Sequence, residues 1–301
     1  MISLEFARIR PMNASIALAT PSDGCRLQSR RGTRGERHIL RKLVTVGLTV
    51  MTVFAVAAVA AAQYNVAPVV TVTGSVTPSK GGTKKKPVNA STVIKFDVNP
   101  ESNSTLAGID YGIPASLKIS GAGFAKCSAT TINNKGETQC PSKSKVGTGA
   151  ATALLGPGKT PIQFTVNVYA NGPTGLTLAL KQTNGSVQVA FDAKIANNRV
   201  AFSIPSNVQQ PAPGLYSYVT SVTANLGPAK ATKTVKKKVT VRVKGKKKKK
   251  TIKVKKTYFL VSRTGCINNA DVIDVKLNLA NNPNPPAVNP VSGNVSKPCT
   301  K

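Results

Sequence analysis

Short alternating runs of apolar and polar residues fill the chain from Val66 onward and constrain its fold more than any other feature. A period of two predicts β-strands with one buried face, and the Gly, Pro, Asn and Ser residues between the runs predict turns. No stretch beyond Ala62 keeps helical spacing over three turns. The pattern therefore predicts an all-β, mostly antiparallel β-sandwich over residues 63–280, Ig-like in the broad sense. Its predicted strands cover residues 69–76, 92–98, 115–120, 146–155, 161–170, 176–182, 187–195, 199–204, 215–226 and 271–279.

Three connections between these strands have the composition of tight hairpin turns: Asn171-Gly172, Asn184-Gly185 and Asn197-Asn198. Asn and Gly accept the left-handed backbone conformation that two-residue hairpins require. After the last strand the chain becomes rich in Pro and Asn. We expect this tail, residues 281–301, to be extended or loose.

An uncharged apolar run of twenty residues, Leu43–Ala62, precedes the strands. Two basic residues come directly before it, and it ends in the A-x-A pattern of Ala60 and Ala62. We therefore expect a signal peptide cleaved between Ala62 and Gln63, and a secreted, extracellular or cell-surface protein. The run is also just long enough to span a bilayer. The alternative is an uncleaved transmembrane helix, in a single-pass membrane protein with a cytoplasmic N-terminus.

The leader before the apolar run, residues 1–42, carries nine basic and three acidic residues and no hydrophobic period, so we expect it to be disordered. Removing residues 1–62 leaves 33 basic and 7 acidic residues, a net charge of about +26. Thirty of the 33 are lysines.

Four cysteines remain after the predicted cleavage: Cys127, Cys140, Cys266 and Cys299. An even number in an exported chain favours disulfide bonds over free thiols. Of the three possible pairings, the short separation favours Cys127 with Cys140, which leaves Cys266 with Cys299. A zinc site is less favoured, because the segment contains no C-x-x-C and no histidine.

The mature segment lacks the usual catalytic groups. The only histidine, His38, lies in the leader, so no imidazole base is available to a Ser or Cys nucleophile. No carboxylate lies in a recognisable motif, and Asp271 and Asp274 are expected to face opposite sides of one strand. We predict no catalytic, cofactor-binding or metal-binding residue. A hydrolase that uses carboxylates or Ser-Lys pairs is the least favoured alternative, because we expect Ser142-Lys143 and Ser144-Lys145 to be exposed loop residues.

The segment Lys230–Lys256 contains fifteen basic residues and no acidic one. Valines alternate with polar residues before the lysine run 246–250, and Ile252 and Val254 do so after it. This pattern predicts a β-hairpin with the lysine run at its tip. We expect its return strand to continue into residues 257–261. The candidate polyanion-binding residues are Lys236, Lys237, Lys238, Arg242, Lys244, Lys246, Lys247, Lys248, Lys249, Lys250, Lys253, Lys255 and Lys256.

This hairpin has two interpretations. Its lysines can keep an exposed strand pair soluble. They can also bind a polyanion: an anionic cell-wall polymer such as teichoic acid, an acidic polysaccharide, lipid headgroups or extracellular DNA. Lysine lacks the bidentate fork of arginine, so we expect such binding to be nonspecific and sensitive to salt. The sequence predicts no small-molecule substrate.

Residues 124–152 read FAKCSATTINNKGETQCPSKSKVGTGAAT. This segment resembles a group of uncharacterised secreted bacterial β-sandwich proteins that share F-x-K-C, then C-P-x-x-S-K-[VI]-G-x-G-x-A, and lysine-rich loops. The resemblance covers residues 70–155 and implies the fold and the compartment, without an activity. In physical terms, Gly147 and Gly149 thin one face of a strand where another backbone approaches. They do not form a phosphate loop, because no capped helix and no G-K-[ST] follows.

Overall fold

The computed structural model describes residues 66–185, 187–243, 246–281 and 288–300, apart from the side chains of residues 243 and 246. These residues belong to one compact unit, Ala61–Lys301. The predicted leader, the run Leu43–Ala62 and the predicted cleavage site lie outside the described residues. Within the described part of the chain, no helix is both long enough and apolar enough to cross a membrane.

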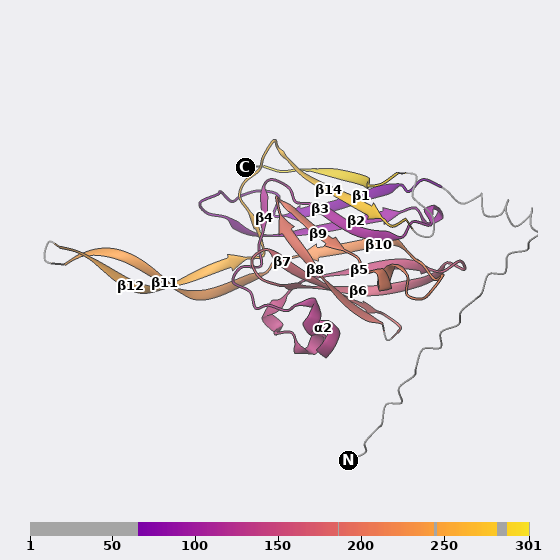
Figure 1. Ribbon diagram of the computed structural model, residues 1–301. Helices are drawn as coiled ribbons and strands as arrows, with labels where there is room; N and C mark the ends of the chain where they lie inside the picture. The colour runs from indigo at the N-terminus through magenta and orange to yellow at the C-terminus, as the bar shows by residue number, and fades with distance from the viewer. Residues whose placement is uncertain (1–65, 186, 244–245, 282–287, 301) are drawn as a thin grey trace, which may run out of the picture. The chain divides into compact units, whose positions relative to one another are not determined.

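Fifteen strands make up most of the described chain (Figure 1). They are β1 (Val70–Thr77), β2 (Val88–Val98), β3 (Leu106–Gly112), β4 (Leu117–Ile119), β5 (Lys145–Leu155), β6 (Thr160–Ala170), β7 (Gly175–Gln182), β8 (Gln188–Ala196), β9 (Arg199–Ser203), β10 (Ser217–Leu226), β11 (Lys230–Val243), β12 (Lys246–Phe259), β13 (Val261–Arg263), β14 (Ala270–Leu279) and β15 (Val291–Pro298). Five short helical segments complete the described elements: η1 (Pro100–Ser102), α2 (Ala129–Lys135), η2 (Glu137–Gln139), η3 (Ser142–Ser144) and α3 (Ser206–Gln209).

Thirteen strands form one sheet, in the order β15-β14-β3-β9-β8-β7-β6-β5-β10-β2-β13-β4, with β1 also paired to β2. All of these strand pairs are antiparallel. The prediction of an all-β, antiparallel fold is therefore confirmed, and each predicted strand overlaps an observed one. The remaining two strands, β11 and β12, form a separate sheet.

The large sheet curves so that its two parts face each other across one hydrophobic core (Figure 1). A central cavity of about 70 Å³ is lined by apolar side chains from β2, β3, β6, β7, β9, β10 and β14. Strand β14 shows why the alternation predicts this arrangement. Its side chains at Ile273, Val275 and Leu277 are buried, and the residues between them are exposed or half-buried.

Asn197 and Asn198 form the turn between β8 and β9, with φ angles of 49° and 60°. Ala196 pairs with Arg199 on either side of them. Two successive residues with positive φ form the hairpin turn whose twist matches the strands. The turn predicted at this position is therefore confirmed.

Gly147 and Gly149 lie on β5 where the backbone of β10 approaches closely. A Cβ atom added at either position meets a carbonyl oxygen, that of Asn225 for Gly147 and that of Thr223 for Gly149. The two glycines therefore allow the close approach of two strands, as the sequence predicts.

The C-terminal tail differs from the prediction. Residues 291–298 form β15, which pairs with β14 over eight residues, and Val291 is buried. Most of the Pro and Asn residues that suggested a loose segment precede this strand in the sequence. Asn294 lies within the strand, and Pro298 is its last residue. Its Gly293 lies against Val70 and Val72 of β1, where no side chain fits. The tail is therefore part of the domain and places β15 against β1.

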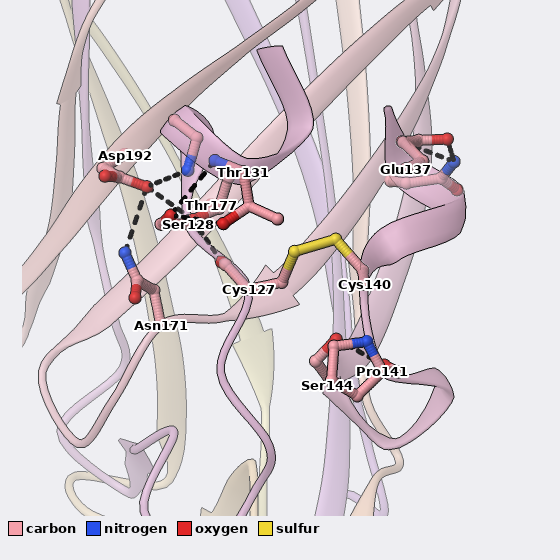
Figure 2. The surroundings of a disulfide bond; sticks show 12 residues. Cys127, Ser128, Thr131, Glu137, Cys140, Pro141, Ser144, Asn171, Thr177 and Asp192 are labelled. Atoms are coloured by element: carbon pink, nitrogen blue, oxygen red, sulfur yellow. Dashed lines mark hydrogen bonds between the residues drawn. A yellow bond between two sulfur atoms is a disulfide. The ribbon is translucent and has the colours of Figure 1, made fainter. Parts of the chain in front are cut away.

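Disulfide bonds join Cys127 to Cys140 and Cys266 to Cys299, the two pairs expected from the sequence. The first bond closes the segment that contains α2 (Figure 2). The Ser128 side chain caps this helix by accepting from the Thr131 amide, and the Asp192 carboxylate accepts from the Ala129 amide. The segment covers the outer face of β6, β7 and β8, where it forms a second, smaller hydrophobic cluster. A closed loop of this length stabilises the fold by about 3 kcal/mol.

Candidate functional site

Strands β11 and β12 form the lysine hairpin, residues 230–259, a two-stranded ribbon separate from the large sheet (Figure 1). The two strands pair over their full length, from Lys230 opposite Phe259 to Val243 opposite Lys246. Only Lys244 and Gly245, which lie outside the described residues, separate them along the chain. At the base of the ribbon, Ala231 packs against the main core and the Tyr258 ring lies against Gly123.

The register corrects two details of the predicted hairpin. The lysine run 246–250 belongs to strand β12 and pairs with residues 239–243, so it does not form the tip. Strand β12 also ends at Phe259 instead of continuing through the next residues. Leu260 is fully buried, and Val261 starts β13, which pairs with β2 and β4 of the large sheet. The ribbon ends at Phe259 because the next residue, Leu260, buries its apolar side chain in the main core.

The pairing sorts the hairpin side chains onto two faces, because successive residues of a strand alternate sides and directly paired residues share a side. The cationic face carries basic residues and threonines, with Phe259 at its base as the one hydrophobic residue among the described side chains. Its basic residues are Lys230, Lys236, Lys238, Arg242, Lys247, Lys249, Lys253 and Lys255, and all eight are exposed.

The opposite, aliphatic face carries Val235, Val239, Val241, Ile252 and Val254. Five exposed lysines share this side of the ribbon: Lys233, Lys237, Lys248, Lys250 and Lys256. The Lys256 ammonium lies 5.0 Å from the centre of the Tyr258 ring two residues on, as expected for side chains on one side of a strand. The sequence indicated most of this face through its alternating valines. It did not indicate Val235 or the lysines of the run 246–250, because a run of identical residues has no period.

Like charges lie directly opposite each other at three positions of the ribbon: Lys233 with Lys256, Lys236 with Lys253, and Arg242 with Lys247. Such pairs destabilise a sheet. Within the described residues, each ion pair involves a cation outside the hairpin. The hairpin is therefore a concentrated positive charge without an internal counter-charge.

Carboxylates of the large sheet hold strands together through arginine. Arg199 on β9 donates from Nε to Asp110 Oδ1 at 2.7 Å on β3, and its Nη2 lies 2.8 Å from Asp274 Oδ2 on β14. Asp271 lies on the opposite face of β14 and is buried, as the sequence predicts for residues three apart on a strand. The structure therefore separates these two carboxylates.

A buried ion pair joins β13 to β14. The Arg263 and Asp271 side chains are 0% and 1% exposed, and Arg263 Nη2 donates to Asp271 Oδ2. Ser116 donates its hydroxyl hydrogen to the other oxygen of the same carboxylate. Arg263 also donates from Nη1 to the Gly265 carbonyl at 3.0 Å. This cluster fixes the region around the Cys266–Cys299 bond.

The Ser-Lys pairs of residues 142–145 lie in and just after η3. Ser144 is buried and donates its hydroxyl hydrogen to the Pro141 carbonyl at 2.5 Å, whereas Lys143 and Lys145 are exposed. The expectation that all four residues are exposed loop residues is therefore wrong for Ser144. Its hydroxyl closes a turn next to Cys140.

A cavity of about 600 Å³ opens at one end of the main core, between β5, β6, β7, β8, β10 and α3. Phe164, Leu180 and Val219 are among its apolar lining residues, and Gln182 and Asn207 add polar groups. None of its described lining residues carries an ionisable side chain.

The chain was compared with protein-family models, with curated proteins and with solved structures, and none of the three comparisons found a match.

Proposed function

We propose that this is an exported, non-catalytic surface or extracellular protein that binds polyanions nonspecifically through the lysine hairpin. One observation carries this proposal: the segment Lys230–Lys256 has fifteen basic and no acidic residues, and it is presented as an exposed ribbon. Solubility alone is served by mixed charges of both signs. It does not explain three cationic pairs placed directly opposite each other at a cost to the ribbon.

The expected affinity follows from the charge. Each lysine near an anionic surface contributes up to about 1 kcal/mol, and physiological salt limits this attraction to about 8 Å. The eight basic residues of the cationic face can meet one surface together. Several kcal/mol remain after the costs of association, which corresponds to micromolar binding.

Changing all five lysines of the run 246–250 to serine is expected to weaken binding to heparin or teichoic acid by about 100-fold at ~50 mM salt. The measurement is a titration of the wild-type and variant chains from Gln63 onward. A matched control loses the same charge elsewhere on the surface, through Lys→Ser changes at five exposed lysines. These are Lys84, Lys85, Lys86, Lys143 and Lys181.

The control is expected to keep its affinity within about threefold, because its lysines are divided among the loop before β2, η3 and β7 and lie outside the hairpin. Equal affinity of the 246–250 variant and the wild type would leave only the solubility interpretation. A wild-type affinity that is the same at about 50 and at about 500 mM salt would lead to the same conclusion.

We also propose that the two facing parts of the large sheet are the layers of a β-sandwich, Ig-like in the broad sense. The shared core between them supports this description. Export is supported by the run Leu43–Ala62 before the domain and by the two disulfide bonds, which are typical of oxidising compartments.

N-terminal sequencing of the protein recovered outside the producing cell is expected to begin at Gln63, because Ala60 and Ala62 occupy the positions that signal peptidase reads. A full-length chain retained in the membrane fraction would instead indicate the single-pass alternative. An Ala62→Phe variant provides the control, and we expect it to remain uncleaved.

A further inference from the structure

The aliphatic face of the lysine hairpin has no partner in the described structure. Val254 is 36% exposed, and Val235, Val239, Val241 and Ile252 are only partly covered. Among the described hydrophobic side chains of the hairpin, only Ala231 at its base packs against the main core. A ribbon that serves solely to present charge has no need for an aliphatic row on one side, and an isolated strand pair is marginally stable in water.

The lysines on the same side restrict what can cover this face. Lys233, Lys237, Lys248, Lys250 and Lys256 surround the aliphatic row. A second copy placed face to face would bring these lysines against the same lysines of its partner, which opposes association. A soluble polysaccharide or nucleic acid neutralises the lysines but offers no apolar layer to the valines. The partner must therefore present negative charge and hydrocarbon within the reach of one lysine side chain.

We propose that the lysine hairpin binds the surface of an anionic lipid bilayer, with its aliphatic face lying at the boundary between headgroups and acyl chains. This proposal rests on the proposed function, since it names the polyanion that the hairpin recognises. Lysine stems can lie along apolar surface while their ammonium groups reach the phosphates. Tyr258 lies on the same side at the base of the ribbon, and tyrosine favours the membrane interface.

Binding to such a surface also relieves the repulsion inside the ribbon. Lipid phosphates can lie between opposed cations such as Lys233 and Lys256, which have no counter-charge among the described residues. The apolar contact adds a part of the affinity that salt does not screen. The two faces thus predict two separable behaviours: charge attraction of a soluble polyanion by either face, and salt-resistant contact with a bilayer by the aliphatic face alone.

The test uses vesicles of phosphatidylcholine with and without phosphatidylglycerol, and heparin as the soluble polyanion. The chain runs from Gln63 onward, so that Leu43–Ala62 cannot bind the vesicles itself; all its described residues lie in the unit Ala61–Lys301. The variant carries Val239→Thr, Val241→Thr and Ile252→Thr, which keep every charge and β-branched side chains. The control carries Thr234→Ser, Thr240→Ser and Thr251→Ser on the cationic face.

The aliphatic-face variant is expected to bind phosphatidylglycerol vesicles about tenfold more weakly than the wild type, and to keep its heparin affinity within about twofold. The control is expected to behave as the wild type with both probes. At about 500 mM salt, residual vesicle binding is expected for the wild type and not for the variant. Retained heparin affinity and an unchanged far-UV circular dichroism spectrum show that the variant is folded.

Each other outcome has a distinct meaning. Wild-type binding to heparin with no binding to phosphatidylglycerol vesicles overturns the bilayer proposal and leaves the polyanion function intact. Equal vesicle affinity of the aliphatic-face variant and the wild type does the same. Concentration-dependent dimers that this variant abolishes would assign the face to a second copy. Failure of the wild type to bind either probe overturns the proposed function, and the bilayer proposal with it.

Discussion

Replacing Arg263 by methionine is expected to lower the free energy of unfolding by about 3–5 kcal/mol. The substitution leaves the Asp271 carboxylate buried at 1% exposure, with the Ser116 hydroxyl as its one remaining partner among the described side chains. A buried charge without its counter-ion carries a large desolvation cost. Because natural domains are stable by 5–15 kcal/mol in general, this one change removes a large fraction of the total.

Urea denaturation followed by far-UV circular dichroism measures the loss, since the chain has no tryptophan. The control is Lys95→Met in the exposed pair Lys95–Asp97, whose side chains are 47% and 41% exposed. An exposed pair contributes at most about 1 kcal/mol. A second variant combines Arg263→Met with Asp271→Leu and is expected to recover much of the stability, because it leaves no unpaired charge. Similar losses for Arg263→Met and Lys95→Met would contradict the role assigned to the cluster.

This cluster shows what the sequence could not predict. Arg263, Ser116 and Asp271 are separated along the chain by as many as 155 residues. Neither the alternation of apolar residues nor the composition indicates that Arg263, four residues after the exposed lysine hairpin, is fully buried. Burial of a charge depends on partners that only the tertiary structure brings together.

The strands themselves were largely predictable, because one-sided burial leaves a period of two in the sequence. Strand β3 was missed: Gly108, Asp110 and Gly112 interrupt its apolar positions. Asp110 and Gly112 each have a tertiary reason. Asp110 pairs with Arg199, and the Asp274 carboxylate occupies the space that a side chain at Gly112 would need. Contacts between strands thus overrode the local pattern.

The candidate site was located from the sequence, but its two faces were not. Fifteen cations without an acid identify the segment by composition alone. Which lysines share a side with the valines depends on the register, and a shift by one residue moves every side chain to the other face. The pairing of Val243 with Lys246 sets this register and places Lys248 opposite Val241.

The C-terminal tail, residues 281–301, is where the structure differs most from the sequence-based prediction. Composition predicts an extended or loose segment over residues 281–301, whereas the structure shows a paired strand and a disulfide-bonded cysteine there. Strand β15 pairs with β14, Gly293 lies against β1, and Cys299 is bonded to Cys266 across 33 residues. A disulfide loop of that length contributes about 4 kcal/mol by loop entropy.

A chain that ends at Ala280 is therefore expected not to fold. It loses the bond to Cys266 together with the strand that covers one edge of β14, a combined loss comparable to the whole stability of a typical domain. The matched control deletes a similar length from the lysine hairpin, residues 234–255, and joins Lys233 to Lys256 through Asn-Gly. This control is expected to stay folded, because the hairpin forms its own sheet and only its base joins the core. Circular dichroism and resistance to proteolysis distinguish the two variants. A truncated chain as folded as the control would show that the tail is dispensable after all.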